Sequence, residues 1–152
     1  MLKKIFFIIL SLNLLNHCDY TPVYSKQNKV NYKIIINSFS GDKDINNLIA
    51  SNLKRYSKES SNEIVDISFD TKYTKSVLAK NSAGSITDYQ VDVVTAFIIK
   101  KENNSESFSV NEKFNFKKMT DKYEEKNYER NIKKNLANSI SQKLILRLAV
   151  IK

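Results

Sequence analysis

Three segments of the chain alternate strictly between apolar and polar residues, and this alternation constrains the fold more than any other feature. They cover residues 63–75, 87–101 and 107–118. Successive side chains of a strand point to opposite faces, so a period of two predicts half-buried strands of an antiparallel sheet. The intervening "KNSAGS" and "ENNSE" are turn compositions and favour a three-stranded meander. The residues expected to face inward are Val65, Ile67, Phe69, Tyr73, Tyr89, Val91, Val93, Phe97, Ile99, Phe108, Val110, Phe114 and Phe116.

The outward face of the second alternating segment is partly apolar. Val94, Ala96 and Ile98 occupy positions that the pattern assigns to solvent. They are consistent with a β-bulge, an additional contact surface, a partner's docking place, or chance strand composition. The sequence leaves these four interpretations open.

A short strand and a helix are predicted before the meander. Residues 30–39, "VNYKIIINSF", form an apolar run rich in β-branched residues, which is typical of a strand. A helix is expected over 43–58, with Asp42 and Asp44 as candidate N-caps. Its apolar residues recur with helical spacing on one face. They are Ile45, Leu48, Ile49, Leu53 and Tyr56.

A long helix is predicted over 120–150, with Thr120 or Asp121 as its cap. Its apolar positions recur every four residues: Tyr128, Ile132, Leu136, Ile140, Leu144 and Leu148, supplemented by Ala137 and Ile151. The element order is therefore β-α-β-β-β-α. It predicts an α+β fold, a four-stranded mostly antiparallel sheet with two amphipathic helices packed on one face. We expect residues 30–152 to form this single domain, since a chain of 152 residues has the length of one domain.

The amino terminus resembles an export signal. Two lysines precede an apolar stretch, Ile5–Leu15. About eleven residues is the length of a signal-peptide apolar region, whereas a membrane-spanning helix needs roughly 17–25. Cys18 lies three residues after Leu15, which predicts a lipoprotein signal peptide over 1–17, a lipid anchor on Cys18 and a tether over 18–29. An uncleaved short anchor and a free buried cysteine are the alternatives.

The formal net charge of +9 fits either an anionic partner or compositional drift toward lysine. Nucleic acid, phospholipid and a phosphorylated glycolipid are the anionic candidates, and an export signal argues against nucleic acid. Catalytic motifs are missing from the sequence: it has no Gly-rich phosphate loop, no nucleophile elbow, and one histidine, His17, inside the predicted signal peptide. We therefore expect no enzyme activity, no cofactor and no metal site.

Two stretches resemble the LPS-assembly lipoprotein (LptE) family of alphaproteobacteria. "CDYTPVY" is similar to the family's opening Cys–Gly–aromatic–x–Pro–Leu–Tyr, with matches at Cys18, Tyr20, Pro22 and Tyr24. "YERNIKKNLANSISQKLILRL", residues 128–148, resembles the family's last helix. The family's fold is a four-stranded sheet with two helices on one side, which agrees with the element order predicted from the residues.

The resemblance implies an outer-membrane lipoprotein on the periplasmic face. Such a protein would plug a LptD-type β-barrel, help it assemble and assist lipopolysaccharide delivery to the outer leaflet. From turn position and charge, the candidate lipopolysaccharide contacts are Lys75 and Lys80 near one hairpin tip and Lys100 and Lys101 near the next. The alternative function is an auxiliary lipoprotein of a lipid-transport ABC system.

Overall fold

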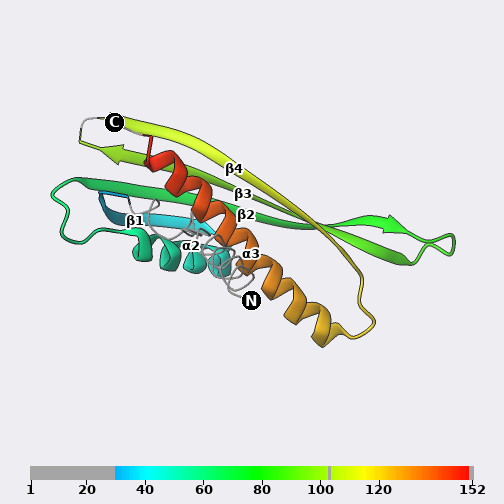
Figure 1. Cartoon of the computed structure of the whole chain (residues 1–152). Helices are drawn as coiled ribbons and strands as arrows, with labels where there is room; N and C mark the ends of the chain where they lie inside the picture. The colour runs from blue at the N-terminus through cyan, green and yellow to red at the C-terminus, as the bar shows by residue number, and fades with distance from the viewer. Residues whose placement is uncertain (1–29, 103, 151–152) are drawn as a thin grey trace, which may run out of the picture.

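The computed structural model describes residues 30–102 and 104–150. The predicted signal peptide, Cys18, the tether and Ile151 lie outside them. The elements are β1 (Lys33–Gly41), α2 (Lys43–Tyr56), β2 (Ile64–Lys80), β3 (Ile86–Lys101), β4 (Asn104–Lys117) and α3 (Lys122–Leu148). The predicted element order and α+β class are confirmed (Figure 1).

The four strands form one sheet in the order β1-β2-β3-β4. β2, β3 and β4 pair antiparallel and make the expected meander. β1 pairs parallel to β2, and its register shifts between Ile36 and Ser38. A parallel pair needs a crossover connection, and α2 supplies it. The sheet is therefore mostly antiparallel, with one parallel edge strand.

Both helices begin at aspartate caps. The Asp42 carboxylate accepts a hydrogen bond from the Ile45 backbone N–H at 2.9 Å, and Asp121 caps α3 in the same manner. Gly41 joins β1 to α2 with φ of +91°, a conformation that L side chains rarely adopt. A Cβ atom at Gly41 would lie 2.0 Å from the Thr71 carbonyl oxygen. Only glycine therefore fits this tight junction.

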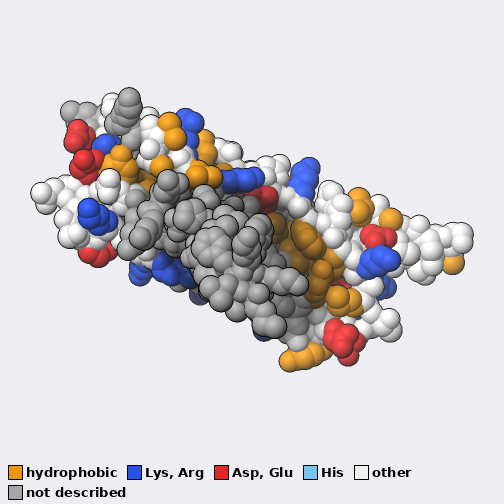
Figure 2. Space-filling model, viewed as in Figure 1, with side chains coloured by type: hydrophobic (Ala, Val, Ile, Leu, Met, Phe, Trp, Pro, Cys, Tyr) orange, Lys and Arg blue, Asp and Glu red, His pale blue; other side chains and the backbone are white. Residues whose placement is uncertain are grey.

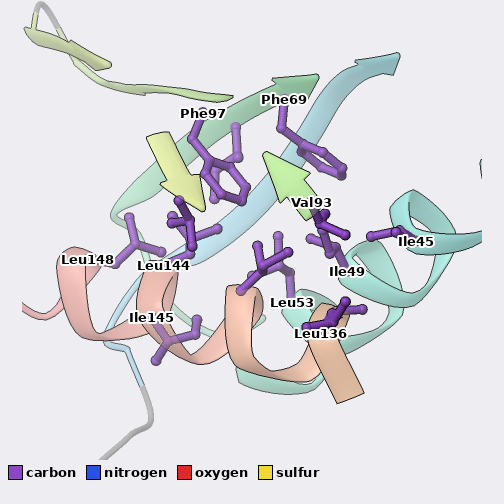
Figure 3. Close-up of a cluster of buried hydrophobic side chains, with 14 of the residues drawn as sticks. Ile45, Ile49, Leu53, Phe69, Val93, Phe97, Leu136, Leu144, Ile145 and Leu148 are labelled. Atoms are coloured by element: carbon purple, nitrogen blue, oxygen red, sulfur yellow. The ribbon is translucent and has the colours of Figure 1, made fainter. Parts of the chain in front are cut away.

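The hydrophobic core lies between the two helices and one face of the sheet. Figure 3 shows side chains of α2 and α3 directed toward Phe69, Val93 and Phe97 of the sheet. Phe97 is fully buried and packs against Phe69 and Phe108, with ring centroids 5.6 and 5.3 Å away. Thr71 and Thr95 are also buried on this face, and their hydroxyls share a hydrogen bond of 3.0 Å. The helical contribution is Ile45, Ile49, Leu53, Ile132, Leu136, Ala137, Ile140, Leu144, Ile145 and Leu148.

Two residues predicted to face inward are more exposed than expected. Phe114 pairs with Val91 on the inner face but is 38% exposed, whereas Val110 and Phe116 on the same face of β4 are buried. Tyr128 is 37% exposed, and its ring contacts Phe116 at 5.8 Å instead of entering the core. Conversely, Ile145 lies off the predicted four-residue series and is buried.

The hairpin formed by β2 and β3 is longer than the alternation predicted. The two strands stay paired beyond the end of β4, and this part, residues 78–87, is called the hairpin arm below. Figure 1 shows it projecting past the helices. The Asn81 side chain accepts hydrogen bonds from the backbone N–H groups of Ala83 and Ser85, and Gly84 takes a positive φ. The arm therefore has a well-defined tip.

Candidate functional surface

The sheet face opposite the helices is predominantly polar, and we call it the outer face. Residues that pair across neighbouring strands lie on the same face, so the strand register identifies its members. Across the middle of the sheet, one row consists of Lys72, Val94 and Asn111, and the next consists of Thr74, Asp92 and Lys113. Further polar members on β2, β3 and β4 include Asp66, Ser68, Asp70, Ser76, Gln90, Lys100, Ser107, Ser109 and Asn115.

A small apolar patch interrupts the outer face. Val94, Ala96 and Ile98 lie on β3 within an uninterrupted register, so the β-bulge interpretation of these residues is wrong. Ile98 is 47% exposed. A shallow cavity of about 290 Å³ opens beside it, lined by Ser38, Phe39, Ser40, Ser68, Phe69, Asp70, Ala96 and Ile98. Hydroxyl groups therefore surround a small apolar contact area.

Lys75 lies on the inner face, between the sheet and the first turns of α3. Its Nζ atom is 3.0 Å from Glu125 Oε1 and 2.9 Å from Glu129 Oε2. It also lies 4.3 Å from the centroid of the Tyr89 ring. The Tyr73 hydroxyl donates to Glu129 at 2.5 Å. These contacts, called the Lys75 network below, hold the base of the hairpin arm against α3.

The charges of the Lys75 network reinforce one another. Burial alone lowers the pKa of Lys75, but hydrogen bonds to Glu129 and Glu125 outweigh it and raise that pKa above its usual value. Burial alone raises the pKa of both glutamates, but the bonds they accept from Lys75 and its neighbours hold each pKa below its usual value. The pKa of Tyr73 is raised, mainly by burial and secondly by its hydrogen bond to Glu129. At neutral pH Lys75, Glu125 and Glu129 are therefore ionised, whereas Tyr73 keeps its proton and donates it in a hydrogen bond to Glu129.

The other candidate lysines lie at the two ends of the sheet. Lys80 is exposed where the hairpin arm turns, and Lys100 is exposed near the opposite end of β3. The two positions are about 45 Å apart along the strand. Lys101 is 3.1 Å from Glu63 and 4.6 Å from the centroid of the Tyr32 ring. The hydrogen bond to Glu63 raises the pKa of Lys101, with burial opposing it. The four candidates do not form one site.

A cleft at the base of the hairpin arm gathers lysines that the sequence analysis missed. Its volume is about 840 Å³, and it lies between the arm and the connection from β4 to α3. Figure 2 shows hydrophobic and charged side chains close together in the region of the arm. The cleft is lined by Ile86, Thr87, Tyr89, Lys117, Lys118, Met119, Thr120, Lys122 and Glu125. The run "KKMTDK" was visible in the sequence, but its position beside the hairpin arm was not.

The described residues contain no group of three or more His, Cys, Asp or Glu side chains that could hold a metal ion. No helix in the described ranges is long and apolar enough to span a membrane. Asp66, Ser68 and Asp70 share the outer face, where Asp70 accepts a hydrogen bond from Ser40.

The fold is similar to solved structures of bacterial proteins named as lipoproteins. Rare lipoprotein B from Shewanella oneidensis is 13% identical, with a TM-score of 0.52 over 71% of this chain and 93% of that one. A protein assigned as a lipoprotein from Caulobacter crescentus CB15 is 7% identical, with a TM-score of 0.52 over 80% of this chain and 90% of that one. No family model matches the sequence. No curated protein matches it significantly either. At these identities the likeness establishes a common fold.

Proposed function

We propose that the chain is an outer-membrane lipoprotein, held on the periplasmic face through Cys18, that plugs and helps assemble a LptD-type β-barrel. In this role it assists lipopolysaccharide delivery to the outer leaflet and binds without catalysing a reaction. The observation that carries the proposal is the outer face of the sheet, which is polar while both helices lie on the opposite face.

The outer face has the chemistry that a barrel lumen accepts. Lumens of large barrels are polar, so a plug presents hydroxyl, amide and charged groups that can exchange hydrogen bonds with the wall. Four strands about 4.8 Å apart give a face roughly 15 Å wide, which suits the lumen of a wide, plugged barrel. The apolar patch at Val94, Ala96 and Ile98 offers a small area of direct packing within this polar surface.

The cleft at the base of the hairpin arm supports the part of the proposal that concerns lipopolysaccharide. Lys117, Lys118 and Lys122 provide positive charge for phosphate groups, and Lys serves such sites as a point charge. Ile86 and Tyr89 add apolar surface beside them. Lys80 and Lys100 remain candidate contacts because each is exposed and forms no ion pair with a described residue.

The lipid anchor rests on the sequence and is supported by the fold. An apolar stretch followed by Cys18 predicts acylation, and two or more acyl chains hold a protein firmly on a bilayer. Two structures with this fold are named as lipoproteins. A periplasmic lipoprotein meets both the barrel and the lipid that the barrel exports.

The test is purification of the full chain through a carboxy-terminal tag after detergent extraction, followed by mass spectrometry. We expect a diacylated Cys18 peptide and a co-purified LptD-type barrel. An unmodified peptide that reads through His17 and Cys18 would refute the anchor. Recovery of an inner-membrane permease complex in place of the barrel would refute the plug and favour the ABC-system alternative.

A matched pair of variants tests the outer face itself. Ala96→Lys adds a long charged side chain to an exposed position next to Asp70 and Ser109, and we expect it to abolish recovery of the barrel. Leu146→Lys makes a comparable change at an exposed position on α3 and should leave recovery unchanged. Circular dichroism verifies that both variants fold. Equal barrel recovery by the two folded variants would contradict the outer face as the contact surface.

A further inference from the structure

The first half of α3 carries four basic residues in one series. Lys122, Lys126, Arg130 and Lys134 recur every four residues, and all four are exposed. Residues four apart on a helix are neighbours, so these side chains form a continuous stripe about 18 Å long, called the basic ridge below. None of them forms an ion pair with a residue in the described ranges.

The basic ridge is unfavourable for the helix on its own. Like charges at a spacing of four residues repel each other. Lys122 and Lys126 also lie near the positive end of the helix dipole, where acidic residues are preferred. The acidic residues that could compensate are directed elsewhere, because Glu125 and Glu129 bind Lys75 of the sheet. Helix stability therefore does not account for this arrangement, whereas an anionic partner would.

An exposed aromatic side chain accompanies the ridge. Tyr123 is 73% exposed, and at 100° per residue it projects from the same side of α3 as Arg130 and Lys134. Glu124 projects about 140° away from the centre of the ridge. Tyrosine has an apolar ring and a polar hydroxyl, a combination suited to the boundary between lipid headgroups and water. Lysine and arginine complement anionic headgroups in the same layer.

We propose that α3 contacts an anionic phospholipid surface through the basic ridge and Tyr123. This inference rests on the lipid anchor of the proposed function, because acylation at Cys18 would keep Val30, where the described chain begins, within about 40 Å of a bilayer. Consecutive members of the ridge differ by only about 40° around the helix axis, so neighbours such as Lys126 and Arg130 can meet a flat anionic surface together. The contact uses α3, which packs on the face of the sheet opposite the outer face, so it leaves the outer face available to the barrel.

The experiment uses the full-length chain in phospholipid nanodiscs of two compositions, phosphatidylcholine alone and phosphatidylcholine with phosphatidylglycerol. An environment-sensitive fluorophore on Tyr123→Cys reports contact of the ridge with headgroups. The same fluorophore on Leu146→Cys is the control position, because Leu146 is exposed on a different side of α3. We expect a blue shift at position 123 that depends on phosphatidylglycerol and weakens with added salt, and no such shift at position 146.

Charge-removing variants test whether the ridge causes the shift. Each basic residue near an anionic surface contributes about fivefold to binding, so Lys126→Gln with Arg130→Gln should lower the equilibrium constant for contact about 25-fold. Lys54→Gln with Lys58→Gln removes the same charge from exposed positions outside α3 and should leave the shift intact. Glutamine has a helix propensity close to those of lysine and arginine, so the ridge variant should fold.

Equal spectra in the two nanodiscs would overturn the proposal. A shift that survives Lys126→Gln with Arg130→Gln would overturn it too, because the lipid contact would then not depend on the charges of the ridge. Intact-mass measurement of the same preparation reports acylation at Cys18 separately. The intact mass therefore reports whether Cys18 is acylated. The spectra, recorded on nanodisc-bound protein in every case, report whether the ridge contacts the lipid.

Discussion

Replacement of Lys75 by methionine should destabilise the fold by removing the charge that the Lys75 network depends on. Methionine keeps an apolar stem that can pack over the Tyr89 and Phe116 rings. It leaves Glu125 and Glu129 close together without their cation. The expected loss therefore reports the electrostatic part of the contact between the hairpin and α3.

The magnitude follows from the partial burial of the three side chains. Their exposed fractions are 24% for Lys75, 17% for Glu125 and 23% for Glu129. Solvent-exposed ion pairs contribute about 0–1 kcal/mol, and removal of one partner from a fully buried pair costs about 3–5 kcal/mol. We expect an intermediate loss of about 2 kcal/mol in the free energy of unfolding. For a domain of this size that lowers Tm by about 8 °C.

The effect should also depend on pH in a defined direction. The folded pKa values of Glu125 and Glu129 are lowered, so their stabilisation is complete above the ordinary carboxyl value of about 4.3 and is lost as pH falls through the folded values. The folded pKa of Lys75 is raised, so its contribution is complete below about 10.4 and is lost as pH rises through the folded value. The difference between wild type and Lys75→Met should therefore be constant between these limits.

The assay is urea unfolding of the full chain, followed by circular dichroism, for wild type, Lys75→Met, Glu129→Gln and the double variant. The double-mutant cycle isolates the coupling between the two side chains, which we expect to be about 1 kcal/mol at neutral pH. Two results would refute the reasoning: a loss below about 0.5 kcal/mol at neutral pH, or an equally large loss at about pH 3.

The remaining predictions concern a backbone junction and the cleft. Gly41→Ala should cost about 3 kcal/mol or more, because its Cβ would collide with the Thr71 carbonyl at a positive φ, whereas Gly84→Ala should cost only about 1 kcal/mol. Urea unfolding of both variants measures this difference, and equal losses would show that the Gly41 junction can relax. Lys117→Gln with Lys118→Gln should lower lipopolysaccharide capture by the full chain several-fold, since both lysines line the cleft. Lys80→Gln with Lys100→Gln tests the two exposed contacts that were predicted from the sequence. If either double variant captures lipopolysaccharide as well as wild type does, its two lysines are not lipopolysaccharide contacts.

The sequence patterns predicted the elements well because burial on one face imposes a regular period. The alternation around Ile67 and Phe97 and the four-residue series ending at Leu148 all correspond to buried stripes. The extent of the hairpin was not predictable in the same manner. Beyond Tyr73 the inner-face positions no longer pack in the apolar core, and the β2 register shifts near Ala79. The alternation of apolar and polar residues that marks a half-buried strand therefore stops before β2 ends.

The Lys75 network and the cleft could not be predicted from the sequence, because both are formed by contacts between segments that are distant along the chain. Lys75 looked like a surface lysine because its partners, Glu125 and Glu129, lie about fifty residues further along the chain. Their pairing becomes visible only once α3 crosses the sheet. The cleft was missed for the same reason, since Lys118 and Ile86 come from different elements. The outer face, by contrast, was predictable, because the polar residues at every second position of each alternating segment must lie on one face of the sheet.

The parallel pairing of β1 with β2 has a consequence for the order of folding. The β2–β3 and β3–β4 pairs are joined by short turns, but partners such as Lys33 and Ile64 are about thirty residues apart. Local pairs close with less entropy loss, so the meander should assemble first and leave β2 as a temporary edge strand until β1 docks. Asp66, Asp70 and Lys72 then lie on that open edge. Charged side chains on an edge strand oppose pairing with a second copy, which protects this intermediate from aggregation.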